Sequence, residues 1–122
     1  MLALTGLVSV GLIHDWLAWN SARWEVGRRA LVRGIDPWDI EGGVEWNGWF
    51  AVEQRPGRPV GVRRGPTLRF TRDWFPHVTG RYALAFSQPP GTLRRDSEPY
   101  SLWLLPGRRE FVLIEPEPKK SP

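Results

Sequence analysis

The sequence contains no cysteine among its 122 residues. This absence excludes a disulfide framework and any metal site built from thiolates. The two histidines, His14 and His77, lie far apart in the chain and do not form a metal-binding motif. No internal repeat and no complete catalytic motif is visible. We therefore predict no cofactor, no metal and no catalytic residue in this chain.

The charge is modestly basic, with 17 lysines and arginines against 13 acidic residues. Most of the basic residues are arginines scattered through glycine- and proline-rich turns, and no recognition helix or aromatic stacking motif accompanies them. We therefore predict that nucleic acid is not a partner. Arginines that adjoin an apolar helix better match a membrane surface with anionic headgroups.

The first 13 residues carry no charge, and leucine, valine and isoleucine cover every face of the helix they would form. Such a pattern is typical of a helix surrounded by lipid or by a protein core. At about 1.5 Å per residue, the run is too short to cross a hydrocarbon core of about 30 Å. It also lacks the basic n-region and the cleavage site of a signal peptide. We interpret it as the end of a transmembrane helix that begins upstream, in contact with membrane lipid and with the transmembrane part of a parent or partner protein.

Beyond residue 13 the pattern becomes amphipathic, so the helix is expected to continue out of the membrane to a C-cap at Gly34. Trp16, Trp19 and Trp24 would either lie at the lipid headgroups or pack on the following domain. His14 and Asp15 form a titratable pair, but adjacent helix positions point about 100° apart, so their side chains need not meet.

Two turn motifs follow the helix. Asp36-Pro37 predicts a short helical turn with Asp36 as N-cap and proline at the first helical position. Asn47-Gly48, flanked by Trp46 and Trp49, is the strongest local signal for a β-hairpin, because a type I′ turn needs positive φ at both central positions. The competing interpretation keeps residues 46–52 helical, at the cost of placing Asn-Gly inside a helix.

The remainder reads as an exposed loop at residues 53–65 and strand-like segments at residues 67–71, 81–87, 100–105 and 110–115. The sequence thus predicts an α+β fold, with a long N-terminal membrane-proximal helix followed by a small antiparallel β meander with a Trp-rich hairpin. The expected organisation is a helix over residues 1–33, a Trp-rich β domain over residues 34–115, and a disordered tail over residues 116–122.

Acids and amides that alternate with indoles are typical of surfaces that bind sugars by hydrogen bonding and stacking. The candidate ligand-binding residues are Asp36, Asp39, Glu41, Glu45, Trp46, Asn47 and Trp49. Glycoside hydrolysis by a pair of these carboxylates is disfavoured, because nothing fixes two of them at a defined separation. The architectural alternative makes Asp36 and Asp39 turn caps, Asn47 a turn residue and Glu45 the partner of a nearby arginine.

The order of residues between positions 14 and 49 resembles that of a known family. The resemblance is carried by His14-Asp15, Trp19-Asn20, Ala22-Arg23-Trp24, Gly34-Ile35, Ile40-Glu41-Gly42-Gly43 and Glu45-Trp46-Asn47-Gly48-Trp49. It resembles the C-terminal segment of bacterial family 39, protein-mannosyltransferase-like membrane glycosyltransferases, which typically carry aspartate at the position of Glu41. That family takes sugar from a polyprenyl-phosphate donor and keeps its catalytic acids in an early extracytoplasmic loop, which these 122 residues do not contain.

The resemblance implies an accessory C-terminal extramembrane domain of a polytopic membrane glycosyltransferase, not catalytic alone and placed on the extracytoplasmic side. Arg23, Arg28, Arg29 and Arg33 oppose that orientation by the positive-inside rule, although folded domains translocate regardless of charge. The alternatives are a membrane-anchored module that binds glycans or lipid headgroups, and a purely structural assembly domain.

Overall fold

The computed structural model describes residues 1–51, 74–105 and 107–117. Its longest element is α1 (Leu2–Val32), an unbroken helix of 31 residues. The Gly34 N–H donates to the Leu31 carbonyl and the Ile35 N–H to the Ala30 carbonyl, with Gly34 at a φ of 83°. These bonds form a Schellman motif, which stops the helix where glycine can adopt the left-handed conformation. The predicted long N-terminal helix and its cap at Gly34 are confirmed.

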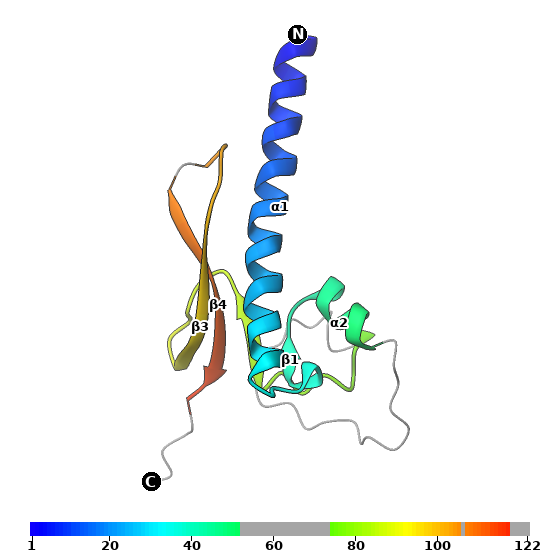
Figure 1. Cartoon of the computed structure of the whole chain (residues 1–122), viewed down its shortest axis with the longest axis vertical. Coiled ribbons are helices and arrows are strands. Elements are labelled where there is room, and N and C mark those ends of the chain that lie inside the picture. Colours follow the sequence, from blue (N-terminus) through cyan, green and yellow to red (C-terminus); the bar gives the residue numbers. More distant parts are fainter. Residues whose placement is uncertain (52–73, 106, 118–122) are drawn as a thin grey trace.

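The other elements are short. They are the 3₁₀ helix η1 (Pro37–Asp39), β1 (Ile40–Glu41), α2 (Val44–Ala51), β2 (Tyr82–Ala85), β3 (Thr92–Ser101) and β4 (Arg108–Pro116). The second half of α1 has the β3–β4 pair on one side and α2 with β1 on the other, while its first half projects beyond the sheet (Figure 1). This arrangement confirms the α+β class.

The sheet is mixed, with strand order β1-β2-β4-β3. β1 runs parallel to β2, and β4 pairs antiparallel with both β2 and β3. The predicted antiparallel meander is therefore wrong, because a meander would place β3 between β2 and β4. The physical reason lies in β4, whose Phe111, Val112, Leu113 and Ile114 are all buried and require cover on both faces. The charged β3 takes the edge instead.

The predicted Trp-rich hairpin is also wrong, because Val44–Ala51 is an α-helix. Gly48 lies within α2 and is not among the glycines with positive φ in the described chain. Of the other predictions, residues 81–87 and 110–115 correspond to β2 and β4, and residues 100–105 overlap only the end of β3. The predicted loop at 53–65 and strand at 67–71 lie outside the described residues, as do residues 118–122 of the predicted tail.

The core lies where the second half of α1 meets the sheet and α2. Its fully buried members are Val26 and Ala30 from α1, Ile40 from β1, Trp46 from α2 and Leu113 from β4. Each of these four elements thus contributes one or two side chains to a single cluster. The first half of α1 contributes nothing to this core, and the side chains of residues 1–10 are exposed.

Candidate functional site

A polar cluster joins α1 to the β1–α2 segment. Its centre is Arg23, whose side chain is only 6% exposed. One terminal nitrogen of the guanidinium, Nη2, donates to Asn20 Oδ1 at 2.6 Å and to Glu45 Oε2 at 2.5 Å. The other, Nη1, donates to the Gly42 carbonyl at 3.3 Å. The predicted pairing of Glu45 with a nearby arginine is thus confirmed, and this arginine ties the two helices together.

The cluster continues through two buried side chains, Glu41 and Asn47. The Asn47 amide donates to Glu41 Oε1 at 2.8 Å, and its oxygen accepts the Gly42 N–H at 3.2 Å. Asn47 therefore closes the turn between β1 and α2 with its side chain, rather than with the positive φ of a hairpin turn. The carboxylates of Glu41 and Glu45 both accept bonds that hold elements together, which is a structural use of these groups.

Trp46 fills the space between α1 and the β1–α2 turn, and only 1% of its surface is exposed. Gly27 and Gly42 face its ring from two sides. A Cβ atom on Gly27 would lie 2.3 Å from Trp46 Cη2, and one on Gly42 would lie 2.3 Å from Trp46 Cγ. Both positions must therefore be glycine for the indole to fit. Trp24 contacts the same ring, with centroids 5.0 Å apart.

The structure places the other predicted site residues elsewhere. Asp36 accepts the Trp38 N–H at 2.9 Å as the N-cap of η1, as predicted. Asp39 accepts the Thr79 hydroxyl at 2.9 Å. Trp49 lies on the outside of α2 and is 74% exposed. The predicted site is therefore divided: Glu41, Trp46 and Asn47 are buried in one cluster, Glu45 joins that cluster from its exposed edge, and the remaining three residues lie outside it.

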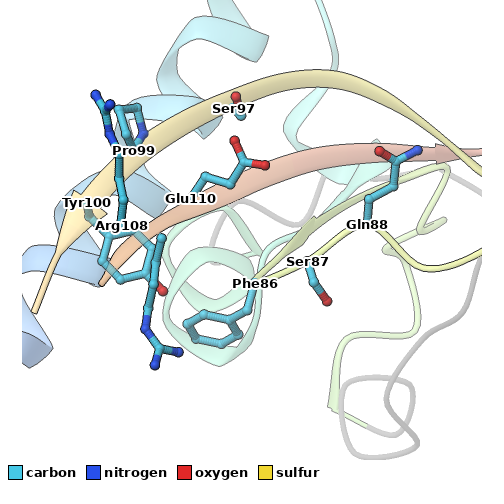
Figure 2. Close-up of a pocket in the computed structure, with 9 residues that line it drawn as sticks. Phe86, Ser87, Gln88, Ser97, Pro99, Tyr100, Arg108 and Glu110 are labelled. Atoms are coloured by element: carbon cyan, nitrogen blue, oxygen red, sulfur yellow. The ribbon is translucent and has the colours of Figure 1, made fainter. Parts of the chain in front are cut away.

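In the part of the chain that the structure describes, hollows lie beside the sheet. A cleft of about 450 Å³ is lined by Trp19 and Arg23 of α1, by the Gly42–Gly43 turn, and by Phe86 and Phe111. The Arg23 guanidinium carbon lies 5.1 Å from the centroid of the Trp19 ring. A second hollow, of about 680 Å³, is formed by β3, β4 and the segment after β2, and its lining includes Tyr100, Arg108, Arg109 and Glu110 (Figure 2). The lining of the first hollow is mainly apolar, and that of the second combines polar and apolar side chains.

A second ionic contact fastens α1 to the edge strand. Arg29 donates to Asp96 Oδ2 at 3.0 Å, to Glu98 Oε2 at 2.7 Å and to the Ser97 carbonyl at 3.0 Å. Burial favours the neutral form of Asp96, but the bonds from Arg29 and the Ser97 N–H, with the charges of Arg29 and Arg33, outweigh it. The pKa of the Asp96 carboxyl is therefore held below its ordinary value.

The connection between β3 and β4 reaches the middle of α1. The His14 ring stacks on Trp103 with centroids 3.9 Å apart, and its Nδ1 lies 3.1 Å from Asp15 Oδ1. Adjacent helix positions alone need not bring His14 and Asp15 together, and here the stacking of Trp103 on the imidazole accompanies their contact. Gly11 lets this segment approach, since a Cβ there would lie 2.9 Å from a methyl carbon of Leu104.

Sequence reasoning did not identify Arg23 as the partner of Glu45, nor Asn20 as a second acceptor for Arg23. The available signal was their spacing, because residues three apart on a helix share a face. Nothing in the sequence showed that β1 and α2 would fold back against that face. Among the residues that the structure describes, no group of three or more His, Cys, Asp and Glu side chains is arranged to hold a metal ion.

By length and composition, α1 is a candidate membrane span. Of the tryptophans expected either at lipid headgroups or on the following domain, Trp19 packs on Phe86 and Phe111 and Trp24 packs on Trp46, whereas Trp16 is exposed. No protein-family model, curated protein or solved structure matches this chain.

Proposed function

We propose that this chain is the membrane-anchored, accessory extramembrane domain of a polytopic membrane protein, of the glycosyltransferase-like kind that its sequence resembles, and that it is not catalytic alone. The observation that carries the proposal is the course of α1. Its exposed apolar first half continues without a break into the turns that supply Val26 and Ala30 to the core. The proposed anchor and the turns that pack in the core therefore belong to one continuous helix.

The polar cluster supports an accessory role rather than catalysis. Arg23, Glu41, Glu45 and Asn47 bond to one another or to the Gly42 backbone, and these bonds join α1 to β1 and α2. A general acid or a nucleophile must instead face substrate. The isolated chain is therefore expected to turn over no polyprenyl-phosphate sugar. Turnover by the purified chain, measured with a radiolabelled donor, would overturn the proposal.

Membrane attachment can be tested on the exposed half of α1. Leu4 and Leu7 are exposed, so replacing both with lysine leaves the core untouched. Lysine in a hydrocarbon environment is costly, by about 2.5 to 3.5 kcal/mol at the centre of a span. The double variant should shift from the carbonate-resistant membrane fraction toward the soluble fraction. Equal extraction of both proteins would contradict attachment through α1, and Ser21→Lys on the exposed surface beyond the apolar half serves as control.

We place the sheet on the extracytoplasmic side, following the resemblance. The chain has no native cysteine, so a single Glu117→Cys substitution at the exposed residue that follows β4 gives one labelling site. A membrane-impermeant maleimide should label this cysteine in intact spheroplasts. Labelling only after lysis would show that the sheet lies on the cytoplasmic side.

A second candidate function is a module that binds a sugar or a lipid headgroup. It is favoured by the cleft lined by Trp19, Phe86 and Phe111 beside the Arg23 guanidinium, because aromatic faces and a cation suit such ligands. Phe86 is exposed, so Phe86→Ala alters the cleft without emptying the core. Mannose and glycerol phosphate should each be titrated by calorimetry into the full chain and the variant. Binding that Phe86→Ala abolishes would support this function, and no binding of either probe would exclude it for these ligands.

A further inference from the structure

The segment between β3 and β4 forms an apolar tip beside the apolar half of α1. The tip comprises Leu102, Trp103, Leu104 and Leu105, and the last three side chains are exposed, with Trp103 at 63%. Domains of this size rarely leave such neighbouring hydrophobic side chains in water. The tip therefore requires an apolar partner.

The height of the tip along α1 is fixed by direct contacts. Leu104 packs on Gly11, and Trp103 stacks on His14. Gly11 belongs to the uncharged run of residues 1–13. It lies about 12 Å from Trp19 along the helix axis, toward the N-terminus. If the apolar half of α1 enters a bilayer, the tip enters to the same depth.

The backbone of the tip is prepared for an apolar environment. The Asp15 carboxylate accepts the Trp103 N–H at 2.6 Å and the Leu104 N–H at 3.1 Å. An irregular segment in contact with lipid must have its polar backbone groups satisfied by protein, because hydrocarbon offers no hydrogen-bond partner. Asp15 meets this demand for two consecutive N–H groups and holds the tip against the helix.

Basic side chains stand immediately behind the tip. Arg108 and Arg109 begin β4, pair with Ser101 and Tyr100 of β3, and are exposed. Both line the hollow of Figure 2. An apolar tip with cations at its base matches the boundary between acyl chains and anionic headgroups.

We propose that the β3–β4 tip inserts into the same bilayer interface that α1 enters, with Arg108 and Arg109 against the headgroups of anionic phospholipid. The inference rests on the proposed membrane attachment of α1. It adds a second point of contact, so that the bilayer holds the sheet at two places instead of one.

The experiment uses the absence of cysteine, which allows one environment-sensitive NBD label per variant of the full chain. Leu105→Cys reports on the tip, Leu7→Cys on α1, and Glu117→Cys on the position just after β4, at the end of the strand away from the tip. The proteins are reconstituted into phosphatidylcholine vesicles with and without phosphatidylglycerol, some of which carry a nitroxide quencher on the acyl chain. We expect quenching at Leu105 and Leu7 and none at Glu117.

The outcomes separate the two proposals. Quenching at Leu7 without quenching at Leu105 would overturn the tip insertion and leave the attachment of α1 intact. No quenching at either position would overturn both. A blue-shifted but unquenched label at Leu105 would show that a second copy of the chain covers the tip, which also contradicts lipid insertion.

Two further variants test the named contacts. Arg108→Gln combined with Arg109→Gln should reduce quenching at Leu105 severalfold in phosphatidylglycerol vesicles and change it little in phosphatidylcholine alone. Asp15→Ala should free the tip, lowering quenching at Leu105 while quenching at Leu7 stays the same. If the double arginine variant changes the quenching at Leu105 equally in both vesicle types, or if Asp15→Ala leaves that quenching unchanged, the proposed contacts are wrong.

Discussion

Replacing Gly27 with alanine should destabilise the domain, although alanine is the better helix former. The added Cβ would lie 2.3 Å from both Trp46 Cη2 and Cζ3 and 3.1 Å from Cε3. Carbon atoms pack at about 3.5 to 4.0 Å, so the ring or the helix must move by more than about 1 Å. Trp46 is 1% exposed and is also closed in by Gly42, which leaves the indole little room to yield.

The net effect is the difference between two opposing terms. Alanine in a helix interior gains about 1 kcal/mol over glycine. Overpacking in a filled core costs about 1 to 3 kcal/mol, and this site is at the severe end because rigid ring atoms on one side face backbone on the other. We expect Gly27→Ala to lower the free energy of unfolding by about 1 to 2 kcal/mol. In a domain of this size the melting temperature falls by several degrees.

The matched control is Gly6→Ala on the same helix, where a Cβ would meet nothing within 4 Å. Near-ultraviolet circular dichroism of the indoles in detergent follows the melting of both variants. A Trp46→Phe background, which shortens the ring, should reduce the cost of Gly27→Ala and give a positive coupling in the double-mutant cycle. If Gly27→Ala melts no lower than Gly6→Ala, the close approach of helix and indole is not a feature of the folded protein.

Three further predictions concern the polar contacts and α2. Arg23→Ala should lower the free energy of unfolding by about 1 to 3 kcal/mol, because it leaves the buried Gly42 carbonyl without its donor. Glu45→Gln, on a side chain 53% exposed, keeps an acceptor for Arg23 and should cost about 1 kcal/mol or less. Equal losses in urea titrations would contradict this asymmetry. Gly48→Ala should raise the free energy of unfolding by about 0.5 to 1 kcal/mol, because Gly48 lies inside α2 and an added Cβ would have its nearest neighbour 3.9 Å away. A fall in the melting temperature would instead favour the hairpin. Because the pKa of Asp96 is lowered in the folded chain, its stabilising contribution is complete above about pH 4 and is lost as the pH falls through the folded pKa. With Asp96→Asn, the melting temperature should therefore fall less steeply as the pH is lowered below about 4. An unchanged dependence of the melting temperature on pH would count against the Arg29 contact.

The elements that the sequence predicted correctly are those governed by local chemistry. The end of α1 follows from glycine at position 34, and η1 follows from Asp36-Pro37, because caps and proline act within a few residues. β2 and β4 follow from runs of apolar and β-branched residues. None of these needs information about distant parts of the chain.

The failures occur where distant contacts overrule local preference. Asn47-Gly48 favours a hairpin, but burial of Trp46 between α1 and the β1–α2 turn, with Asn47 bonded to Glu41, outweighs the cost of about 1 kcal/mol for glycine in a helix. The start of β3 escaped notice because its charged residues resemble a loop. Arg94 pairs with Glu110 across the strands, and Pro99 is tolerated because β3 is an edge strand.

The unbroken course of α1 has a mechanical consequence. The helix contains no proline, and its 31 residues extend over about 46 Å. If α1 enters the membrane as proposed, a change of about 20° in its angle to the bilayer normal would swing its far end through about 16 Å, and such tilts lie within the range that membrane helices adopt. Without a flexible joint to absorb it, the sheet must follow that swing. Such a lever would convert small rearrangements of neighbouring helices within the membrane into large displacements outside it.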